Sequence, residues 1–490
     1  MVDPPVNSTE WLLKSGVNPK FIDSIILTHA HADHDAGTFQ KILEEGKITI
    51  YSTKTIIKSF LRKYSSFSGE SIAFLWKLFS FHPVYIGRTF FLHGGEFEIF
   101  YSLHSIPTIA FRLRFQGKTF VYSSDHQGDP SLQKNLMEKG IISENRLKQL
   151  KDFPWNSDVI YHESGIAPLH TPLSFLCSLP PKHKKRIIVY HITKNDFEKA
   201  KDPDLRRAAF GIENTLVFKT EPFKYEEAYR LLDVLKRLDF LMDMPLWKIQ
   251  QFFCIIQWNQ YKKGERIIKE GSIGNKFFIL VSGNAHVDTA DLLHNKRLGA
   301  FEYFGEVALL TNSTRTANII ADSDVLALTI DKPQFVNFIA GTRFEQILKQ
   351  LIASRSPDTW NLLAESRTFA ILSDYQKMWI ESLLKEKDFS GAGFVVKEGE
   401  PLHGMYLIRN GRVQVKKSGV AVSELERGDI IGMIHKIQKG GKAEFSFFHE
   451  KDLSLYFISR EDILGFAAKN PGVSMKLVYT FNNRKKFEKK

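Results

Sequence analysis

An internal repeat in the second half of the chain places the strongest limit on its fold. The segment GERIIKEGSIGNKFFILVSGNAHV (264–287) matches AGFVVKEGEPLHGMYLIRNGRVQV (392–415) at an offset of 128 residues. Such self-similarity is typical of one structural unit present in two copies. Each copy alternates short β-rich runs with glycine turns and is followed by an amphipathic helix. The sequence therefore predicts two β-rich modules, separated by a helical, polar stretch at about 345–368.

Length and composition limit the class of protein. The 490 residues suffice for about three domains, and 43% hydrophobic with 25% charged residues is ordinary for a soluble globular protein. No apolar run approaches a membrane span, and the N-terminus lacks the features of a signal peptide. Two cysteines cannot form a disulfide framework, so we expect a reducing, cytoplasmic location. The net charge of +12 does not identify a partner, and part of it lies in a basic tail at 476–490 that we expect to be solvated.

The first block, residues 1–220, alternates strands and helices. FIDSIILT has the composition of a buried strand, and AGTFQKILEEG has that of an amphipathic helix. KTFVYSSDH, DVIYHESG and KRIIVYHIT are apolar strands that each end in titratable residues. Chemistry in α/β folds is usually carried by loops at the carboxyl ends of strands. The helical segment EEAYRLLDVLKRLDFLMDM marks the boundary to the second half of the chain.

The segment HAHADH directly follows the first apolar strand and concentrates possible metal ligands. His29 and His31 alternate along an extended segment, and Asp33 and His34 follow at the turn into a helix. Imidazole and carboxylate groups bind zinc, and a catalytic zinc site leaves one position open. Four donors in six residues cannot all bind one ion without strain, so the pattern favours two adjacent ions. The other strand ends offer further candidate ligands: His104, Asp125 and His191.

This ordered set resembles the metallo-β-lactamase superfamily over about residues 1–220, and within it the ribonuclease Z and phosphodiesterase branch. The resemblance implies an αββα sandwich that binds two zinc ions. It also implies that His29, His31 and His104 bind one ion, that Asp33, His34 and His191 bind the other, and that Asp125 bridges them. HESGIAPLHT resembles the segment that places Glu163 and His170 beside the metals. Asp35 is expected instead to be an N-terminal helix carboxylate stabilised by the helix dipole.

One feature departs from that superfamily. Its members usually carry about two β-strands and a turn before the metal-binding loop, ending in an aspartate and small residues. Here the segment VDPP begins at residue 2, so the first strands of the sandwich are expected to be missing. Either the chain is N-terminally truncated or another segment completes the sheet.

The first repeat contains FGEVALLTNSTRTAN, residues 304–318, whose pattern favours phosphate binding. A helix N-terminus and an arginine can hold a phosphate, while a glutamate suits ribose hydroxyl donors. The stretch resembles the phosphate-binding cassette of cyclic-nucleotide-binding domains. By that resemblance, Glu306 holds the ribose 2′-hydroxyl and Arg315 the cyclic phosphate, with backbone contacts from Gly305, Val307 and Ala308. Thr316 stands where a threonine can bond the guanine amino group, which favours cGMP slightly over cAMP.

The two repeats define two domains, at 225–345 and 365–475, each expected to be a β-roll with flanking helices. The second repeat departs from the cassette. Aligning IIGMIHKIQKGGKAE with YFGEVALLTNSTRTA puts Met433 at the position of Glu306 and Lys442 at that of Arg315. Methionine cannot accept a hydrogen bond from ribose, so we expect this copy to bind no nucleotide.

Taken together, these patterns predict a dizinc hydrolase regulated by cAMP or cGMP. A phosphodiester is the expected substrate, with Asp33, Glu163 and His170 as catalytic residues and nucleic acid as a partner only if it is that substrate. Two zinc ions serve a thioester, a lactone or an RNA end equally well. A non-catalytic nucleotide sensor with the first block as a scaffold is the alternative of a different class.

Overall fold

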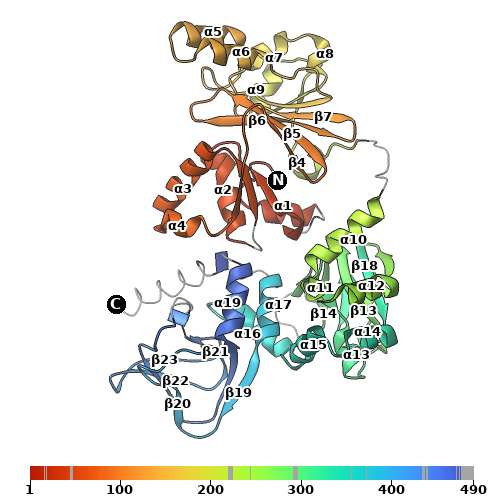
Figure 1. Ribbon diagram of the computed structural model, residues 1–490, viewed down its shortest axis with the longest axis vertical. Coiled ribbons are helices and arrows are strands. Elements are labelled where there is room, and N and C mark those ends of the chain that lie inside the picture. The colour runs from red at the N-terminus through yellow and green to blue at the C-terminus, as the bar shows by residue number, and fades with distance from the viewer. Residues whose placement is uncertain are drawn as a thin grey trace. The chain divides into compact units, whose positions relative to one another are not determined.

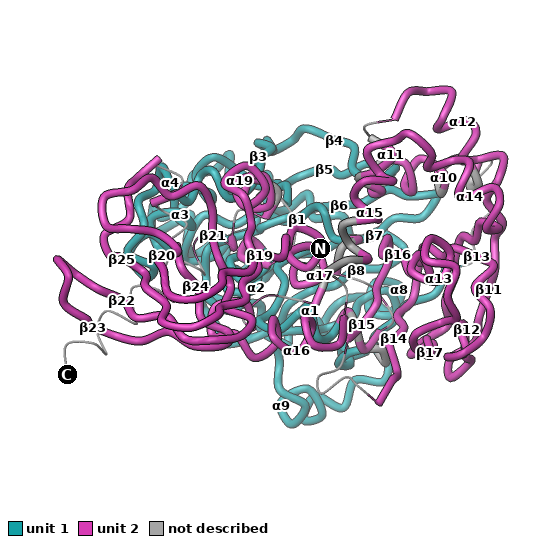
Figure 2. The backbone as a smooth tube through the Cα atoms, turned by 90° about the horizontal axis from the view of Figure 1, so that it is seen from below, with its two compact units in different colours: residues 1–11, 22–41, 48–224 teal, residues 12–21, 42–47, 225–490 magenta. Residues whose placement is uncertain are grey.

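The computed structural model describes residues 1–475 except 16, 18, 45–47, 219–224, 243, 291–295, 355, 371, 373, 433–435, 438–439, 471 and 474. The predicted basic tail therefore lies outside the described residues. The chain divides into two compact units (Figure 2). Unit 1 comprises residues 1–11, 22–41 and 48–224, and unit 2 comprises residues 12–21, 42–47 and 225–490. Over the described part of the chain, every helix is too short or too polar to cross a membrane.

A seven-stranded mixed sheet dominates unit 1, with the order β10-β9-β8-β7-β6-β5-β4. Its strands are β4 (Thr89–Leu92), β5 (Gly95–Ser102), β6 (Thr108–Phe115), β7 (Lys118–Tyr122), β8 (Val159–Glu163), β9 (Ile187–Tyr190) and β10 (Arg206–Arg207). From β4 to β7 neighbouring strands run antiparallel, and from β7 to β10 they run parallel. Consequently β5, β7, β8 and β9 all end at the same edge of the sheet.

A smaller parallel sheet, β1 (Ser24–Ile26), β2 (Thr49–Ser52) and β3 (Ser80–Pro83), completes the β structure of unit 1. Val2 extends it by a parallel bridge to Ile26. Helices α2 (Ala32–Ile42), α3 (Lys54–Ser68) and α4 (Ile72–Leu75) accompany this sheet, while α1 (Ser8–Lys14) begins in unit 1 and ends in unit 2. Helix α3 begins where Thr53 accepts a hydrogen bond from the backbone of Ile56, and it ends at Gly69, which adopts a left-handed conformation.

The remaining helices of unit 1 connect the strands of the large sheet. They are α5 (Pro130–Glu138), α6 (Glu144–Lys151), α7 (Leu173–Ser178), α8 (Pro181–Lys184) and α9 (Lys194–Lys199). Figure 1 shows α5–α8 on one side of this sheet and α1–α4 on the other. The apolar runs predicted as strands form the core, because Val121, Ile160 and Val189 are fully buried.

Unit 2 contains two β-rolls with the same strand order, which confirms the internal repeat. The first consists of the sheets β11-β18-β13-β16 and β12-β17-β14-β15, and the second of β19-β26-β21-β24 and β20-β25-β22-β23. The register shifts at the same place in both copies, between Leu280 and Ser282 and between Ile408 and Asn410. Such a bulge is a specific local feature, so its recurrence indicates one structure built twice.

The first roll consists of β11 (Gln257–Tyr261), β12 (Arg266–Ile268), β13 (Lys276–Ser282), β14 (Ala285–Asp288), β15 (Lys296–Leu298), β16 (Tyr303–Phe304), β17 (Asn318–Ala321) and β18 (Val325–Asp331). The second consists of β19 (Lys385–Phe389), β20 (Gly393–Val396), β21 (Gly404–Asn410), β22 (Val413–Lys417), β23 (Val420–Leu425), β24 (Ile430–Ile431), β25 (Ser446–His449) and β26 (Leu453–Ser459).

Helices flank both rolls, as the sequence predicted. They are α10 (Glu226–Arg237), α11 (Asp239–Met242), α12 (Leu246–Ile255), α13 (Glu306–Leu310), α14 (Lys332–Ile339), α15 (Arg343–Ser354), α16 (Pro357–Glu365), α17 (Asp374–Leu383) and α19 (Arg460–Lys469). The predicted helical stretch between the repeats corresponds to α15 and α16. Helix α17 then leads directly into β19, the first strand of the second roll.

Candidate metal centre and nucleotide pocket

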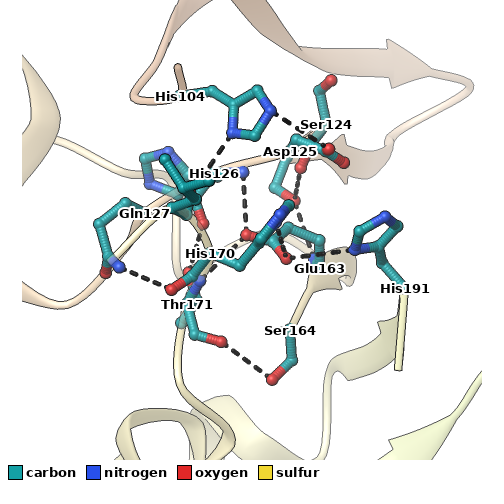
Figure 3. Close-up of polar contacts among 12 residues, drawn as sticks. His104, Ser124, Asp125, His126, Gln127, Glu163, Ser164, His170, Thr171 and His191 are labelled. Carbon is teal, nitrogen blue, oxygen red and sulfur yellow. Dashed lines mark hydrogen bonds and ion pairs between the residues drawn. The ribbon is translucent and has the colours of Figure 1, made fainter. Parts of the chain in front are cut away.

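All seven predicted ligands meet where strands of unit 1 end. The loop after β1 carries His29 and His31, and the first turn of α2 carries Asp33 and His34. The loops after β5, β7 and β9 carry His104, Asp125 and His191. Figure 3 shows His104, Asp125 and His191 around one centre. Ser124 and His191 both have positive φ, at 52° and 61°. This conformation is uncommon outside glycine and often occurs at functional loops.

The seven donors divide into two sets that share Asp125. One set is His29, His31, His104 and Asp125, the other is Asp33, His34, Asp125 and His191, and within each set the ligand atoms lie within 4.8 Å of one another. His104 Nε2 lies 3.5 Å from Asp125 Oδ2, and His34 Nε2 lies 3.1 Å from Asp125 Oδ1. Each oxygen of this carboxylate therefore faces a different set, as a bridging ligand requires.

The surroundings of His29 show whether the donor set suits a metal ion. This side chain is fully buried, and its Nε2 atom has no hydrogen-bond partner among the described residues. The Oδ2 atom of Asp125 lies 3.7 Å from this nitrogen. Burial, together with the charge of His34, keeps the pKa of His29 far below its usual range, so the imidazole is neutral. A buried neutral nitrogen directed at a carboxylate without bonding it suits a metal ligand.

His34 is held between two carboxylates. Its Nδ1 lies 3.0 Å from Asp3 Oδ2, and its Nε2 lies 3.1 Å from Asp125 Oδ1. Burial disfavours the charged ring, but the hydrogen bonds to Asp125 and Asp3 outweigh burial and raise the pKa of His34 to about 10. A metal ion bound at Nε2 must therefore displace a proton, which couples metal affinity to pH.

Asp3 is a residue of this site to which the sequence analysis assigned no role. It is buried, and besides His34 it accepts hydrogen bonds from the Thr28 backbone at 2.9 Å and the Tyr122 hydroxyl at 3.2 Å. Gly37 in α2 permits this placement, since a Cβ there would lie 2.0 Å from the Pro4 carbonyl oxygen. The sequence analysis noted the segment VDPP, which contains Asp3. It could not assign Asp3 a role, because the residues that Asp3 contacts are distant in sequence.

Asp35 lies in the first turn of α2, as predicted, and it belongs to none of the candidate metal-ligand groups among the described residues. It is fully buried and accepts hydrogen bonds from Lys63 Nζ at 2.7 and 2.8 Å and from the Tyr64 hydroxyl at 2.9 Å. Lys63 Nζ also donates to the carbonyl of Ala30, between two predicted ligands, at 3.1 Å. A neighbouring cation on α3 therefore stabilises this carboxylate and supports the loop.

Glu163 and His170 lie beside the seven donors, at the end of β8 and in the loop that follows. Glu163 is fully buried, and its Oε1 atom accepts hydrogen bonds from the backbones of His126 at 2.9 Å and Thr171 at 3.0 Å. Its Oε2 atom lies 3.2 Å from His170 Nδ1. Burial raises the pKa of Glu163, and the hydrogen bond to Glu163 is the main cause that raises the pKa of His170.

The ring of His170 borders both donor sets. Its centroid lies 5.1 Å from that of His104 and 4.8 Å from that of His191. Gln127 holds the loop in place by donating its side-chain amide to the carbonyl of His170 at 2.6 Å (Figure 3). The same amide donates to the carbonyl of Pro168 at 3.0 Å. Gln127 was not among the predicted site residues, because nothing in its own sequence context indicates this contact.

A second candidate site is a cavity of about 230 Å³ in the first β-roll. All six residues predicted from the cassette line it: Gly305, Glu306, Val307, Ala308, Arg315 and Thr316. Arg315 is buried and donates to the carbonyls of Gly305 at 2.7 Å and Lys276 at 2.6 Å. Gly305 has φ of 88°, and a Cβ there would lie 2.7 Å from Arg315 Nη1, so only glycine fits.

Several cavity residues lie outside the cassette and were not predicted. Ile268, Val287, Leu298 and Ile319 form an apolar wall together with Phe304, the first residue of the cassette, and Thr289, Lys296 and Ser356 are polar lining residues. Trp360 of α16 also lines the cavity, although the sequence placed that helix outside the first domain. Neither the ring of Trp360 nor the cation of Lys296 carries a local sequence signal of this role.

The predicted alignment of the second cassette is wrong by one residue at Arg315. In the first copy, the Gly271 backbone donates to the carbonyl of Arg315 at 2.9 Å. In the second copy, the equivalent Gly399 donates to the carbonyl of Ala443, also at 2.9 Å. Ala443, rather than Lys442, therefore occupies the position of Arg315.

The isolated β-bridges support this correction. Ile273 pairs with Thr314 in the first copy, and Pro401 pairs with Lys442 in the second, so Lys442 corresponds to Thr314. The second cassette has one more residue than the first, which the ungapped alignment could not reveal. Met433, the predicted counterpart of Glu306, lies outside the described residues.

Comparison with protein families agrees with this division of the chain. The family described as the cyclic nucleotide-binding domain matches residues 258–342 and 386–470. The family described as anti-Pycsar protein Apyc1 matches residues 1–207. The chain thus carries two cyclic-nucleotide-binding domains, which confirms the fold predicted for both repeats.

Two relatives from Dictyostelium discoideum are similar along most of the chain. The cGMP-dependent 3′,5′-cGMP phosphodiesterase A is 32% identical over 483 residues, covering 98% of this chain and 55% of the relative. The cAMP/cGMP-dependent 3′,5′-cAMP/cGMP phosphodiesterase B is 32% identical over 479 residues, covering 88% of this chain and 43% of the relative. The chain therefore spans about half the length of these relatives. Cyclic-AMP-bound PfPKA-R (141–441) covers 55% of this chain and 92% of its own at 18% identity, but the TM-score of 0.30 supports no inference.

Proposed function

We propose that this homologue of the cGMP-dependent phosphodiesterase A of Dictyostelium discoideum is a metal-dependent phosphodiesterase regulated by a cyclic nucleotide. The observation that carries the proposal is the meeting of seven ligand atoms in two sets around Asp125, with the Glu163–His170 pair beside them. The names of the relatives favour a cyclic nucleotide as the phosphodiester substrate. The regulatory site is the cavity of the first β-roll.

We further propose that unit 1 is the αββα sandwich of the metallo-β-lactamase superfamily. Its two sheets, with helices α5–α8 on one side and α1–α4 on the other, support this assignment (Figure 1). The position of the ligands also supports it, because all of them follow carboxyl ends of strands in the predicted order.

Two zinc ions fit the donor chemistry, since every ligand is an imidazole or a carboxylate. His29, His31 and His104 would hold one ion, Asp33, His34 and His191 the other, and Asp125 would join both. Bound there, the ions would supply a nucleophile at neutral pH and neutralise charge on the phosphoryl oxygens.

The pair of His170 and Glu163 would supply the proton for the leaving oxygen of the diester. Because His170 Nδ1 bonds the carboxylate of Glu163, the proton available for transfer is the one on Nε2. The raised pKa of His170 favours the protonated ring that a general acid needs. Glu163 is positioned for this role by two backbone amides and by its complete burial.

In the first β-roll, Arg315 would bind the cyclic phosphate and Glu306 the ribose hydroxyl. An arginine offers paired donors to phosphate, and a carboxylate accepts from hydroxyl groups. In the second roll, alanine at position 443 lacks any donor, so one nucleotide is expected per chain. Nucleotide binding changes activity only if it favours one state of the catalytic unit over another.

Metal analysis is the experiment that tests the catalytic proposal. The purified chain is expected to contain about two zinc ions, since seven donors exceed what one tetrahedral site can use. Asp33→Ala should lose mainly one ion and His104→Ala mainly the other, whereas His82→Ala, an exposed histidine outside both sets, should retain both. Folded wild-type protein that contains no metal after growth with zinc would contradict the proposal.

Hydrolysis assays then separate the possible substrates. The assays compare cyclic nucleotides, a linear diester, a thioester, a lactone and a short RNA as substrates. Each is measured with and without a second cyclic nucleotide, added at a saturating concentration to fill the regulatory site. We expect the chain to hydrolyse the phosphodiesters but not the thioester or the lactone, and we expect the regulatory nucleotide to change the rate. Two bound ions without turnover of any of them would favour a nucleotide sensor with unit 1 as a scaffold.

Asp3→Ala tests the contact that orients His34. Residues that orient a metal ligand typically contribute about 10- to 100-fold to metal affinity, so we expect zinc binding to weaken by that factor. Competition with a chelating dye measures the affinity, and Glu10→Ala on the exposed face of α1 is the control. Unchanged zinc affinity in a folded Asp3→Ala variant would show that Asp3 only anchors the N-terminus.

A further inference from the structure

Ser124 directly precedes Asp125, the candidate bridging ligand, and its backbone conformation suits glycine better than serine. Its φ is 52°, in the left-handed region that disfavours a side chain. The residue is fully buried, so solvent offers its hydroxyl group no partner. Strained residues other than glycine persist where their surroundings fix them, and they cluster at functional sites. Glycine would fit this backbone at a lower cost, which points to a use for the serine side chain.

Hydrogen bonds from neighbouring side chains hold the loop around Ser124 in its conformation. The Ser123 hydroxyl donates to the carbonyl of Ser124 at 2.7 Å. The Ser102 hydroxyl lies 2.9 Å from the carbonyl of Ser123 and 2.8 Å from that of Asp125. Three consecutive carbonyl groups are thus paired, and none of these contacts uses the hydroxyl of Ser124. That hydroxyl is therefore available for another role.

The hydroxyl group of Ser124 lies between Thr28 and His29. Its Oγ atom is 2.6 Å from Thr28 Oγ1 and 3.4 Å from His29 Nδ1. Thr28 Oγ1 lies 3.2 Å from the same nitrogen of His29. All three side chains are fully buried. Two hydroxyl groups therefore meet one ring nitrogen of a candidate metal ligand, in a place closed to solvent.

The hydrogens of this cluster have one consistent assignment. A histidine that binds a metal through Nε2 is neutral and carries its hydrogen on Nδ1. In His29, Nε2 is the nitrogen directed at Asp125, so the hydrogen on Nδ1 needs an acceptor. Thr28 donates its own hydrogen to the carboxylate of Asp3, so Ser124 donates to Thr28. Lone pairs of both hydroxyl oxygens then remain to accept from His29.

We propose that Ser124 is a positioning residue of the metal centre, an inference that rests on the zinc binding proposed above. Its hydroxyl group fixes the orientation of Thr28 and, together with Thr28, accepts the Nδ1 hydrogen of His29. The ring is thereby kept in the tautomer that directs the lone pair of Nε2 at the ion. Partners that orient a ligand in this way contribute to metal affinity. Glycine at position 124 would relax the backbone but supply no hydroxyl group.

Two variants of the full chain separate the hydroxyl group from the backbone strain. Ser124→Ala and Ser124→Gly both remove the hydroxyl, but only the glycine variant relieves the positive φ. Both should weaken the binding of one zinc ion about 10-fold, near the lower limit for such partners because Thr28 remains. The alanine variant should nevertheless unfold at a lower temperature than the glycine variant. Competition with a chelating dye measures the affinity, and thermal unfolding of the metal-free chain measures the stability.

Ser418→Gly is the matched control. Ser418 is an exposed serine of the second roll with φ of 48°, so the same substitution relaxes the same backbone conformation outside the metal centre. Its zinc affinity should equal that of the wild type. Wild-type affinity in Ser124→Gly together with a loss in Ser124→Ala would mean that backbone geometry alone shapes the site. That result would reject the proposal.

The metal centre fails separately from this inference. If folded wild-type protein binds no zinc, the centre itself is wrong and the role of Ser124 falls with it. If the wild type binds two zinc ions and both Ser124 variants bind them equally tightly, the centre stands. In that case His29 needs no second acceptor, and only the role of Ser124 is rejected.

Discussion

Replacing His170 by alanine is expected to slow turnover of a diester by about 10²- to 10⁴-fold while the bound metal remains, the usual contribution of a positioned general acid. His170 contacts Glu163 and belongs to neither set that surrounds Asp125, so its loss removes a proton donor and no predicted zinc ligand. Steady-state kinetics together with metal analysis of the same preparation measures both quantities. Leu169→Ala, an exposed neighbour in the same loop, is the matched control.

The leaving group sharpens this test. A diester that releases a stable phenolate needs little help from a proton, whereas one that releases an alkoxide needs it in full. His170→Ala should therefore affect the second substrate much more than the first. Equal losses on both, or full turnover of the alkoxide diester, would reject His170 as the general acid and leave it a role in binding.

Replacing Arg315 by alanine is expected to weaken cyclic-nucleotide binding by about 10- to 150-fold. Removing one partner of a charge-assisted hydrogen bond costs about 1.5 to 3 kcal/mol, which corresponds to that range. Arg315 is buried and donates to the carbonyls of Gly305 and Lys276, so its guanidinium is held in a fixed orientation. Titration calorimetry with cAMP and cGMP measures both the affinity and the number of sites.

The second roll provides the internal control for Arg315. Lys442→Ala and Met433→Ala should leave nucleotide binding unchanged, because Lys442 corresponds to Thr314 and methionine offers ribose no acceptor. One nucleotide per chain is the expected stoichiometry. A stoichiometry of two, or unaffected binding in Arg315→Ala, would show that the sensing site is assigned to the wrong repeat.

Much of both sites could be predicted because the residues that matter are close in sequence or follow strands. The candidate ligands in HAHADH lie within six positions, and the cassette lies within fifteen. The more distant candidate ligands, His104, Asp125 and His191, could be predicted because each follows an apolar strand. Strands β5, β7 and β9 end at one edge of the sheet, so their loops had to meet once the sheet formed.

The errors and omissions share a physical cause. Asp35 was correctly placed in the first turn of α2, but its partners Lys63 and Tyr64 were missed because they come from α3. Lys442 was matched to Arg315 because an ungapped alignment cannot detect one extra residue in a loop. In both cases the missing information was a hydrogen bond between segments that are far apart in the chain.

The sequence by itself therefore determined the two-copy β-rolls, the seven donors and the cassette, since each follows from local spacing and the alternation of strands. Only the tertiary structure decided that Asp3 orients His34, that Asp125 turns one oxygen to each donor set, and that Lys296 is paired with Glu381 at the nucleotide cavity. These contacts join residues between 21 and 91 positions apart. Long-range pairs of this kind form only when separate elements pack, and they leave no periodic pattern along the chain.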